Sequence, residues 1–229
     1  MKLSTTVNKA VIKDHFSYNW WKYVLAAVLS VFVWNMYYVQ TMYRPPEDKR
    51  IDIYVQGLPI SQDELNALFE PIWKKYVPDM ETVESVILFT NTDYDYYSSM
   101  QIMTYMMAGQ GDIYMIDGDT FKRYAPQGVF LPLEGFVENG QIDAKGIDLR
   151  NGYISYQYTE DIDGKEVKKS ELHLYGIPLK NIPISEELNA FSENMYLSVL
   201  YANNNEENVI KFIDGFIEEN YRPDTEENR

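Results

Sequence analysis

The 229-residue sequence contains no cysteine and only two histidines, His15 and His173. The absence of cysteine excludes disulfides, zinc-thiolate sites, a thiol nucleophile and a lipid-modified N-terminal cysteine. The sequence also lacks G-x-S-x-G, S-x-x-K and H-E-x-x-H motifs. A histidine triad would have to use His173, which alternates with Leu172 and Leu174 and is therefore predicted to be an exposed position on a strand. We expect no enzymatic activity.

Basic residues are scarce, because 20 Lys and Arg stand against 35 Asp and Glu, a formal net charge of −15. Residues 1–43 contain four lysines and one aspartate, or +3, so residues 44–229 carry −15 − 3 = −18. Such a surface repels phosphate backbones, which argues against a nucleic-acid partner. The 20 tyrosines supply core material and could also form a contact surface.

Formal charge is absent from Tyr23 to Tyr43, a run long enough for a helix to cross a bilayer. Four lysines before the run predict a cytoplasmic N-terminus, and Arg44-Pro45-Pro46 is expected to end the helix. A cleaved signal peptide is the rival interpretation, but the polar leader is long and no small-x-small site follows. Aromatic residues at the ends and centre of the run are the expected membrane anchors: Trp20, Trp21, Tyr23, Trp34, Tyr37 and Tyr38.

The predicted organisation is a single-pass protein of the plasma membrane whose C-terminal part lies outside the cytoplasm. We expect five parts, which are a cytoplasmic segment (1–19), a transmembrane anchor (20–43), a linker (44–50), a lobe (51–221) and a tail (222–229).

The lobe alternates between strand and helix patterns. Apolar strands are predicted at 51–55, 83–89, 112–116 and 195–201. One helix is predicted with an apolar face from Leu65 to Tyr76, a second at about 96–107, and a short third one that runs through Tyr124. Ser61 and Glu64 form a capping box, and Asp117-Gly118-Asp119 is expected to cap the third helix. This rhythm predicts an α/β fold, a three-layer lobe with a mostly parallel sheet flanked by helices.

Finer features are predicted within these elements. In the helix at 96–107, Met103, Met106 and Met107 are expected to point inward. Two strands flanking Asp163-Gly164 predict an edge hairpin. Asn203 to Asn205 offer caps for a last helix, whose apolar stripe comprises Val209, Phe212, Ile213, Phe216 and Ile217.

The stretch from Met100 to Leu133 carries Ala108-Gly109-Gln110-Gly111-Asp112, then an apolar strand, then Gly128-Val129-Phe130-Leu131-Pro132-Leu133. This order resembles the first lobe of bacterial extracellular solute-binding proteins of ABC importers. Tyr175 to Leu179 looks like the segment on which such proteins leave that lobe, and Met195 to Glu219 like the segment on which they return.

The sequence departs from that family between Leu179 and Met195, where fifteen residues stand in place of a second lobe. A unit of two strands and a helix needs ~30 residues or more. The resemblance therefore implies a one-lobed relative, and capture of a ligand by closure of two lobes is in doubt. What remains is the edge of the sheet where parallel strands end, which open α/β sheets use to bind ligands. The candidate binding residues there are Gln56, Gly57, Thr90, Asn91, Thr92, Asp117 and Asp119, although ordinary turns and helix caps also explain them.

Motifs for cofactors and metals are weak, and no cofactor is predicted. Gly109-x-Gly111 lacks the third glycine of a dinucleotide fingerprint and precedes a strand instead of following one. Asp161-x-Asp163-Gly164 lacks the closing glutamate of a calcium loop. The carboxylate pairs Asp93 with Asp95 and Asp117 with Asp119 leave a hydrolase as a third interpretation.

Three functions therefore remain open. The leading one is a non-catalytic binding or scaffold module that meets a protein partner or a second copy. The alternative is a component of solute uptake or sensing that binds a small molecule such as a sugar or peptide.

Overall fold

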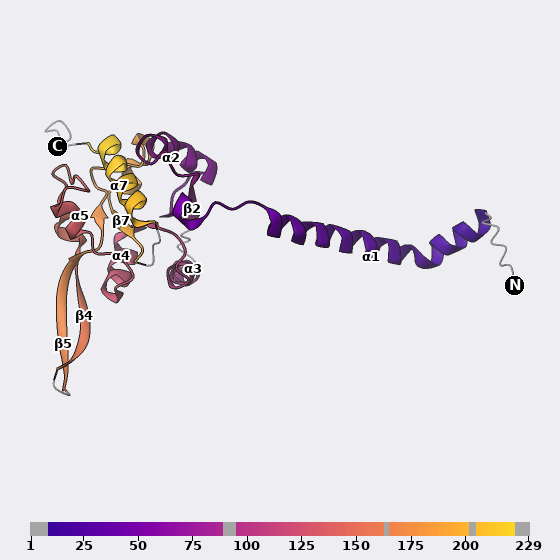
Figure 1. Ribbon diagram of the computed structural model, residues 1–229, viewed down its shortest axis with the longest axis horizontal. Helices are drawn as coiled ribbons and strands as arrows, with labels where there is room; N and C mark the ends of the chain where they lie inside the picture. Colours follow the sequence, from indigo (N-terminus) through magenta and orange to yellow (C-terminus); the bar gives the residue numbers. More distant parts are fainter. Residues whose placement is uncertain (1–8, 89–94, 163–164, 202–204, 223–229) are drawn as a thin grey trace. The chain divides into compact units, whose positions relative to one another are not determined.

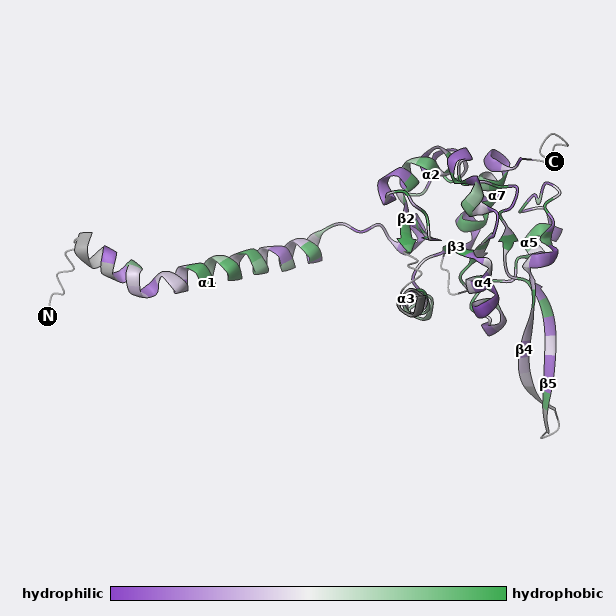
Figure 2. Ribbon diagram, turned by 180° about the vertical axis from the view of Figure 1, so that it is seen from behind, coloured by the Kyte–Doolittle hydropathy of each residue, from purple (hydrophilic) through white to green (hydrophobic). Residues whose placement is uncertain are grey.

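The computed structural model describes residues 9–88, 95–162, 165–201 and 205–222. Its chain divides into two compact units, residues 1–44 and 45–229. Among residues 9–44, which are the described part of the first unit, there is one helix, α1 (Lys9–Thr41), in which His15–Thr41 is long and apolar enough to cross a membrane by length and composition. Figure 2 shows apolar residues along most of this stretch. The helix begins well before the predicted anchor because no glycine or proline interrupts residues 9–41, and it ends ahead of Pro45 as expected.

The second unit is an α/β lobe (Figure 1). Its strands are β1 (Arg50–Gln56), β2 (Thr82–Leu88), β3 (Ile113–Asp117), β4 (Tyr153–Ile162), β5 (Lys165–Leu174), β6 (Ile177–Pro178) and β7 (Met195–Val199). The α-helices are α2 (Gln62–Tyr76), α3 (Asp95–Met107), α4 (Gly118–Tyr124), α5 (Glu134–Glu138), α6 (Asn189–Ser192) and α7 (Glu206–Asn220). Short 3-10 turns are η1 (Glu47–Lys49), η3 (Ala125–Gln127), η4 (Leu149–Gly152) and η5 (Glu186–Leu188).

Five strands form one sheet in the order β2-β1-β3-β7-β6. Strand β1 pairs in parallel with β2 and β3, whereas β7 pairs antiparallel with both β3 and β6. Four of the five strands therefore run in the same direction, and the prediction of a mostly parallel sheet flanked by helices is confirmed. The start of β7 consequently lies at the same edge as the ends of the parallel strands.

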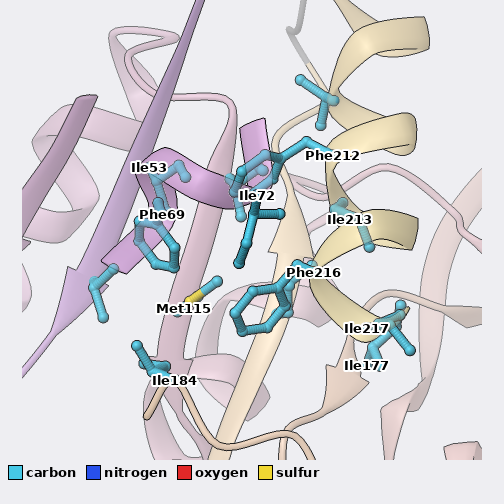
Figure 3. Packing of buried hydrophobic residues seen from close by; sticks show 14 of the residues in the cluster. Ile53, Phe69, Ile72, Met115, Ile177, Ile184, Phe212, Ile213, Phe216 and Ile217 are labelled. Atoms are coloured by element: carbon cyan, nitrogen blue, oxygen red, sulfur yellow. The ribbon is translucent and has the colours of Figure 1, made fainter. Parts of the chain in front are cut away.

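Successive strand residues point to opposite sides of the sheet, so each face has its own apolar side chains. Helices pack on both of these faces. Ile53 and Val55 belong to the core under α2 and α7, whereas Tyr54 between them belongs to a second core under α3 and α4. In the first core, the Phe69 ring meets the Phe212 and Phe216 rings edge-on (Figure 3). The predicted apolar stripe of the last helix is confirmed, since all of its members are buried: Val209, Phe212, Ile213, Phe216 and Ile217. The capping box of Ser61 and Glu64 is also confirmed.

The inward face of α3 differs from the prediction. Met106 is buried, but Met103 and Met107 are 48% and 72% exposed, and Ile102 takes their place in the core. The helix turns residues 102 and 106 toward the sheet, one helical turn apart. Met103 and Met107 lie one position further round the helix and therefore face outward.

The predicted hairpin is present, and within the described part of the chain β4 and β5 pair only with each other, in a two-stranded sheet of their own. Their far end projects away from the rest of the lobe (Figure 1). The predicted turn at 163–164 lies outside the described residues. The prediction that His173 is the exposed position was wrong, because Leu172 is 65% exposed and His173 is half-buried against α5.

The junction before α7 departs from the prediction in one detail. Asn205 occupies the N-cap position, but its side chain makes no capping hydrogen bond. Its buried amide instead donates to the Arg50 carbonyl at 3.0 Å. Strand β7 ends at Val199, two residues earlier than expected, and Leu200 continues as an isolated bridge to Phe130. Asn203 lies outside the described residues.

Candidate functional site

Two of the predicted binding residues meet at the edge where β1 and β3 end. Gln56 is buried and donates from Nε2 to Asp117 Oδ2 at 2.6 Å and to Thr120 Oγ1 at 3.2 Å. The backbone N–H of Asp117 donates in turn to Gln56 Oε1 at 3.1 Å. Parallel pairing of β1 with β3 brings both strand ends to this edge. The two side chains therefore satisfy each other.

Asp117 has a second structural role, because it is the N-cap of α4. Its Oδ1 accepts from the Thr120 backbone N–H at 2.8 Å, so both of its oxygens are used within the fold. Asp119, in the first turn of the helix, is exposed. The arrangement therefore leaves the carboxylate of Asp119, and not that of Asp117, available at the surface.

The remaining predicted site residues are placed as follows. Gly57 follows β1 with a φ of 73° and donates from its backbone N–H to the Leu88 carbonyl at 2.8 Å, which makes it a turn residue. Thr90, Asn91 and Thr92 lie outside the described residues, as does Asp93 of the proposed carboxylate pair. The assignment of a ligand to any of these positions stays a prediction.

The structure adds Asn194 to this edge, a residue that the sequence pattern did not reveal. Its carbonyl accepts from the Gly118 backbone N–H at 2.9 Å, and its exposed side chain lies so close that a Cβ on Gly118 would stand 2.9 Å from Asn194 Oδ1. The signal that could have found it is the direction of β7. Only an antiparallel strand brings the residue before Met195 to the edge where β3 ends.

A cavity of about 350 Å³ lies at the opposite edge, where β1 and β3 begin. Polar and charged side chains dominate its wall, and its lining comprises Glu47, Arg50, Asp52, Tyr54 and residues 108–112. This cavity coincides with the Ala108 to Asp112 motif that carried the family resemblance.

Asp52 and Asp112 are tied together in this cavity. Asp112 Oδ2 accepts from the Asp52 backbone N–H at 2.7 Å, and Asp112 donates its own N–H to the Asp52 carbonyl at 2.8 Å. Arg50 Nε stands 3.3 Å from Asp52 Oδ2. Burial raises the pKa of Asp112 to about 6, and burial also raises the pKa of Asp52 against the opposing charge of Arg50.

The glycine motif beside these carboxylates has a steric explanation. Gly111 has a φ of 84°, in the left-handed region that favours glycine, and a Cβ there would stand 2.4 Å from the Tyr54 ring. That ring stacks on Tyr114 at 5.1 Å between centroids. The motif therefore lets the chain turn tightly over two packed tyrosines, which is a structural role.

Metal binding and hydrolysis receive no further support from these contacts. Within residues 9–88, 95–162, 165–201 and 205–222, no three His, Cys, Asp or Glu side chains gather in the way that a metal site requires. The carboxylate pair of Asp117 and Asp119 is split in role, since Asp117 caps a helix. A glycosidase needs two carboxyl groups facing each other across a cleft.

No protein-family model and no curated protein sequence matches the chain. Similar solved structures are extracellular solute-binding proteins of ABC transporters. One is an extracellular solute-binding protein of family 1 from Alicyclobacillus acidocaldarius, at 20% identity and a TM-score of 0.39, covering 59% of this chain and 29% of that chain. Another is an ABC substrate-binding protein from Listeria monocytogenes in complex with cycloalternan, at 17% identity and a TM-score of 0.35, covering 56% and 28%.

A third is a spermidine/putrescine ABC transporter substrate-binding protein from Streptococcus pneumoniae, at 10% identity and a TM-score of 0.39, covering 75% of this chain and 79% of that chain. The chain spans less than a third of the length of the first two proteins. All three TM-scores are low, at 0.39 or less, and no functional conclusion follows from these likenesses.

Proposed function

We propose that this chain is a non-catalytic binding module, anchored in the plasma membrane of a bacterium by α1, with its lobe outside the cytoplasm. The lobe presents the edge around Asp119 and Asn194 to a protein partner or to a second copy of the chain.

The connection from β6 to β7 carries this proposal. It holds only η5 and α6, helices of three and four residues. Because two strands and a helix need ~30 residues or more, this connection supplies no second lobe to close over the edge. A small molecule bound there would stay open to solvent on one side, whereas pockets that hold small molecules bury most of their surface.

The side chains at the edge are consistent with a contact surface. Gln56 and Asp117 use their polar atoms on each other and on Thr120, so they are not poised to replace those bonds with a ligand. Asp119 and Asn194 are exposed beside them. Exposed polar side chains on a rigid edge suit the rim of a protein interface better than a buried ligand pocket.

Site-specific photocrosslinking of the full chain in cells tests the proposal. A photoreactive residue at Asp119 or Asn194 should give a discrete crosslinked product, whereas the same residue at Glu70 on the exposed side of α2 should not. Equal products from all three positions, or none from the edge, would contradict the proposal.

The alternative function is a small-molecule-binding component of an ABC uptake or sensing system. Thermal unfolding of the chain in the presence of sugars and peptides distinguishes it from the proposed function. A ligand at 100 times its dissociation constant adds ~2.7 kcal/mol to the unfolding free energy. If a sugar or peptide raises the unfolding temperature, and if Asp119→Ala and Asn194→Ala abolish this rise, the alternative function replaces the proposed one.

A further inference from the structure

His173 joins the hairpin to the body of the lobe through two carboxylates. Its Nδ1 stands 2.6 Å from Glu134 Oε1 at the start of α5, and its Nε2 stands 3.4 Å from Glu171 Oε2 on its own strand. Glu134 also accepts the backbone N–H of Leu174 at 3.0 Å, where β5 ends. The ring is therefore held between a helix of the lobe and the base of the hairpin.

The chain of contacts continues outward along the hairpin. Tyr158 on β4 donates from its hydroxyl to Glu171 Oε1 at 2.6 Å. The other groups that face this site are the Tyr175 ring, whose centroid is 5.7 Å from the His173 ring, the cross-strand neighbour Ile154, and Lys169 near Glu171. The groups in contact with His173 thus supply two acidic charges, and the cation Lys169 acts on Glu171.

Both ring nitrogens of His173 face carboxylate oxygens, and carboxylates only accept hydrogen bonds when ionised. A neutral imidazole has one N–H and can satisfy only one of the two. The doubly protonated ring donates to Glu134 and also places its positive charge 3.4 Å from Glu171, so the two carboxylates favour the imidazolium form.

We propose that His173 is a proton-dependent latch, which fixes the β4–β5 hairpin to the lobe when the ring carries both protons and loosens it when one is lost. A two-stranded hairpin is only marginally stable by itself. Most of the hairpin lies beyond this contact, so its orientation depends on the few attachments at its base, among them Tyr156, which packs on Gly128.

The direction of the pH effect follows from the contacts. The hydrogen bond to Glu134 raises the pKa of His173 above its ordinary value, against the opposing effect of burial. The stabilisation is therefore fully present below the unfolded-state pKa of about 6.5 and is lost as the pH rises through the higher folded-state pKa. The hairpin is firmly held in mild acid and freer in mild alkali.

Nuclear magnetic resonance of the full chain in micelles provides the first test. The chain has two histidines, so His15→Gln assigns the His173 ring signal. We expect the titration midpoint of the His173 ring to lie above the ordinary pKa of histidine and to be lower in the Glu134→Gln variant. A midpoint at or below the ordinary value would overturn the proposal.

Backbone hydrogen exchange, corrected for intrinsic rates, provides the second. Between about pH 5.5 and about pH 8.5, protection of the β4–β5 amides near His173 should fall roughly tenfold in the wild type, because the ring loses the positive charge that attracts both carboxylates. It should not change with pH in His173→Gln, and amides of β1 should be unaffected.

If His173→Gln fails to fold, Glu171→Gln replaces it in the hydrogen-exchange experiment, because Glu171 is exposed. It should reduce the pH effect while keeping the contact with Glu134. Equal protection of the wild-type hairpin at both pH values would refute the latch.

Discussion

At the scale of single residues, hydrogen bonds hold the polar side chains at both edges of the sheet. Gln56 donates to the side chain of Asp117 at one edge, and the side chain of Asp112 accepts from the backbone N–H of Asp52 at the other. A buried polar group without a partner costs free energy, and pairing removes that cost. Burial nevertheless disfavours the ionised form of a carboxyl group, so the contact between Asp52 and Asp112 is sensitive to pH.

We expect Asp112→Asn to change how stability depends on pH. Because the folded-state pKa of Asp112 is raised to about 6, the folded state takes up a proton that the unfolded state binds only near pH 4. The contribution of this carboxyl group to stability is therefore present below about pH 4 and lost as the pH rises through about 6.

Urea unfolding should show that the substitution raises the unfolding free energy at pH 7 by about 2 kcal/mol, after a discount for partial exposure, with little effect at pH 4. Asparagine keeps an oxygen to accept the Asp52 N–H. Asp119→Asn is the control for removing one surface charge. An unchanged pH profile in Asp112→Asn would show that Asp112 is ionised without penalty.

At the scale of elements, α2 and α7 pack face to face over the sheet. The contact is close because α7 carries Gly215 opposite Tyr76 of α2, whose ring would lie 2.3 Å from a Cβ at that position. The Tyr76 hydroxyl donates to Glu219 Oε1 at 2.9 Å and keeps the ring in place. Glycine in this helix thus serves packing, at a cost in helix propensity.

Gly215→Ala should accordingly destabilise the lobe, although alanine is the better helix former. We expect a loss of about 1–3 kcal/mol in unfolding free energy, typical of an overpacked core. In a Tyr76→Ala background the same substitution should become neutral or stabilising by up to ~1 kcal/mol, because only the propensity remains. Chemical denaturation of the wild type, the two single variants and the double variant measures the coupling between Gly215 and Tyr76. Additive effects would mean that the ring moves aside freely.

At the scale of the whole molecule, the chain combines an apolar helix with a strongly acidic lobe. The four lysines before the apolar run favour a cytoplasmic N-terminus under the positive-inside rule. This topology is a proposal, and the absence of cysteine makes it easy to test.

A membrane-impermeant maleimide should label Glu70→Cys but not Ser17→Cys in intact cells. Both variants should react after permeabilisation, which controls for accessibility of the thiol. The reverse pattern in intact cells would show that the topology is inverted. Labelling of neither residue in intact cells would show that the lobe lies in the cytoplasm and that position 17 is also shielded from the reagent.

The sequence by itself determined the type and order of the longer elements of the lobe, because their signals are local, whereas it did not reveal the short elements α5, β6 and α6. Ser61 and Glu64 are three residues apart, and the stripe from Val209 to Ile217 repeats within one helix. The apolar run at 23–43 and the stop before Pro45 were equally readable.

Only the tertiary structure decided what depends on contacts between distant residues. Gln56 and Asp117 are 61 residues apart, and His173 and Glu134 are 39 apart, so no local pattern pairs them. The direction of β7, which brings Asn194 to the site, and the rotation of α3, which exposes Met103, follow from packing against the sheet. Packing of this kind depends on the summed shape of many side chains, and a periodic pattern of residues does not encode it.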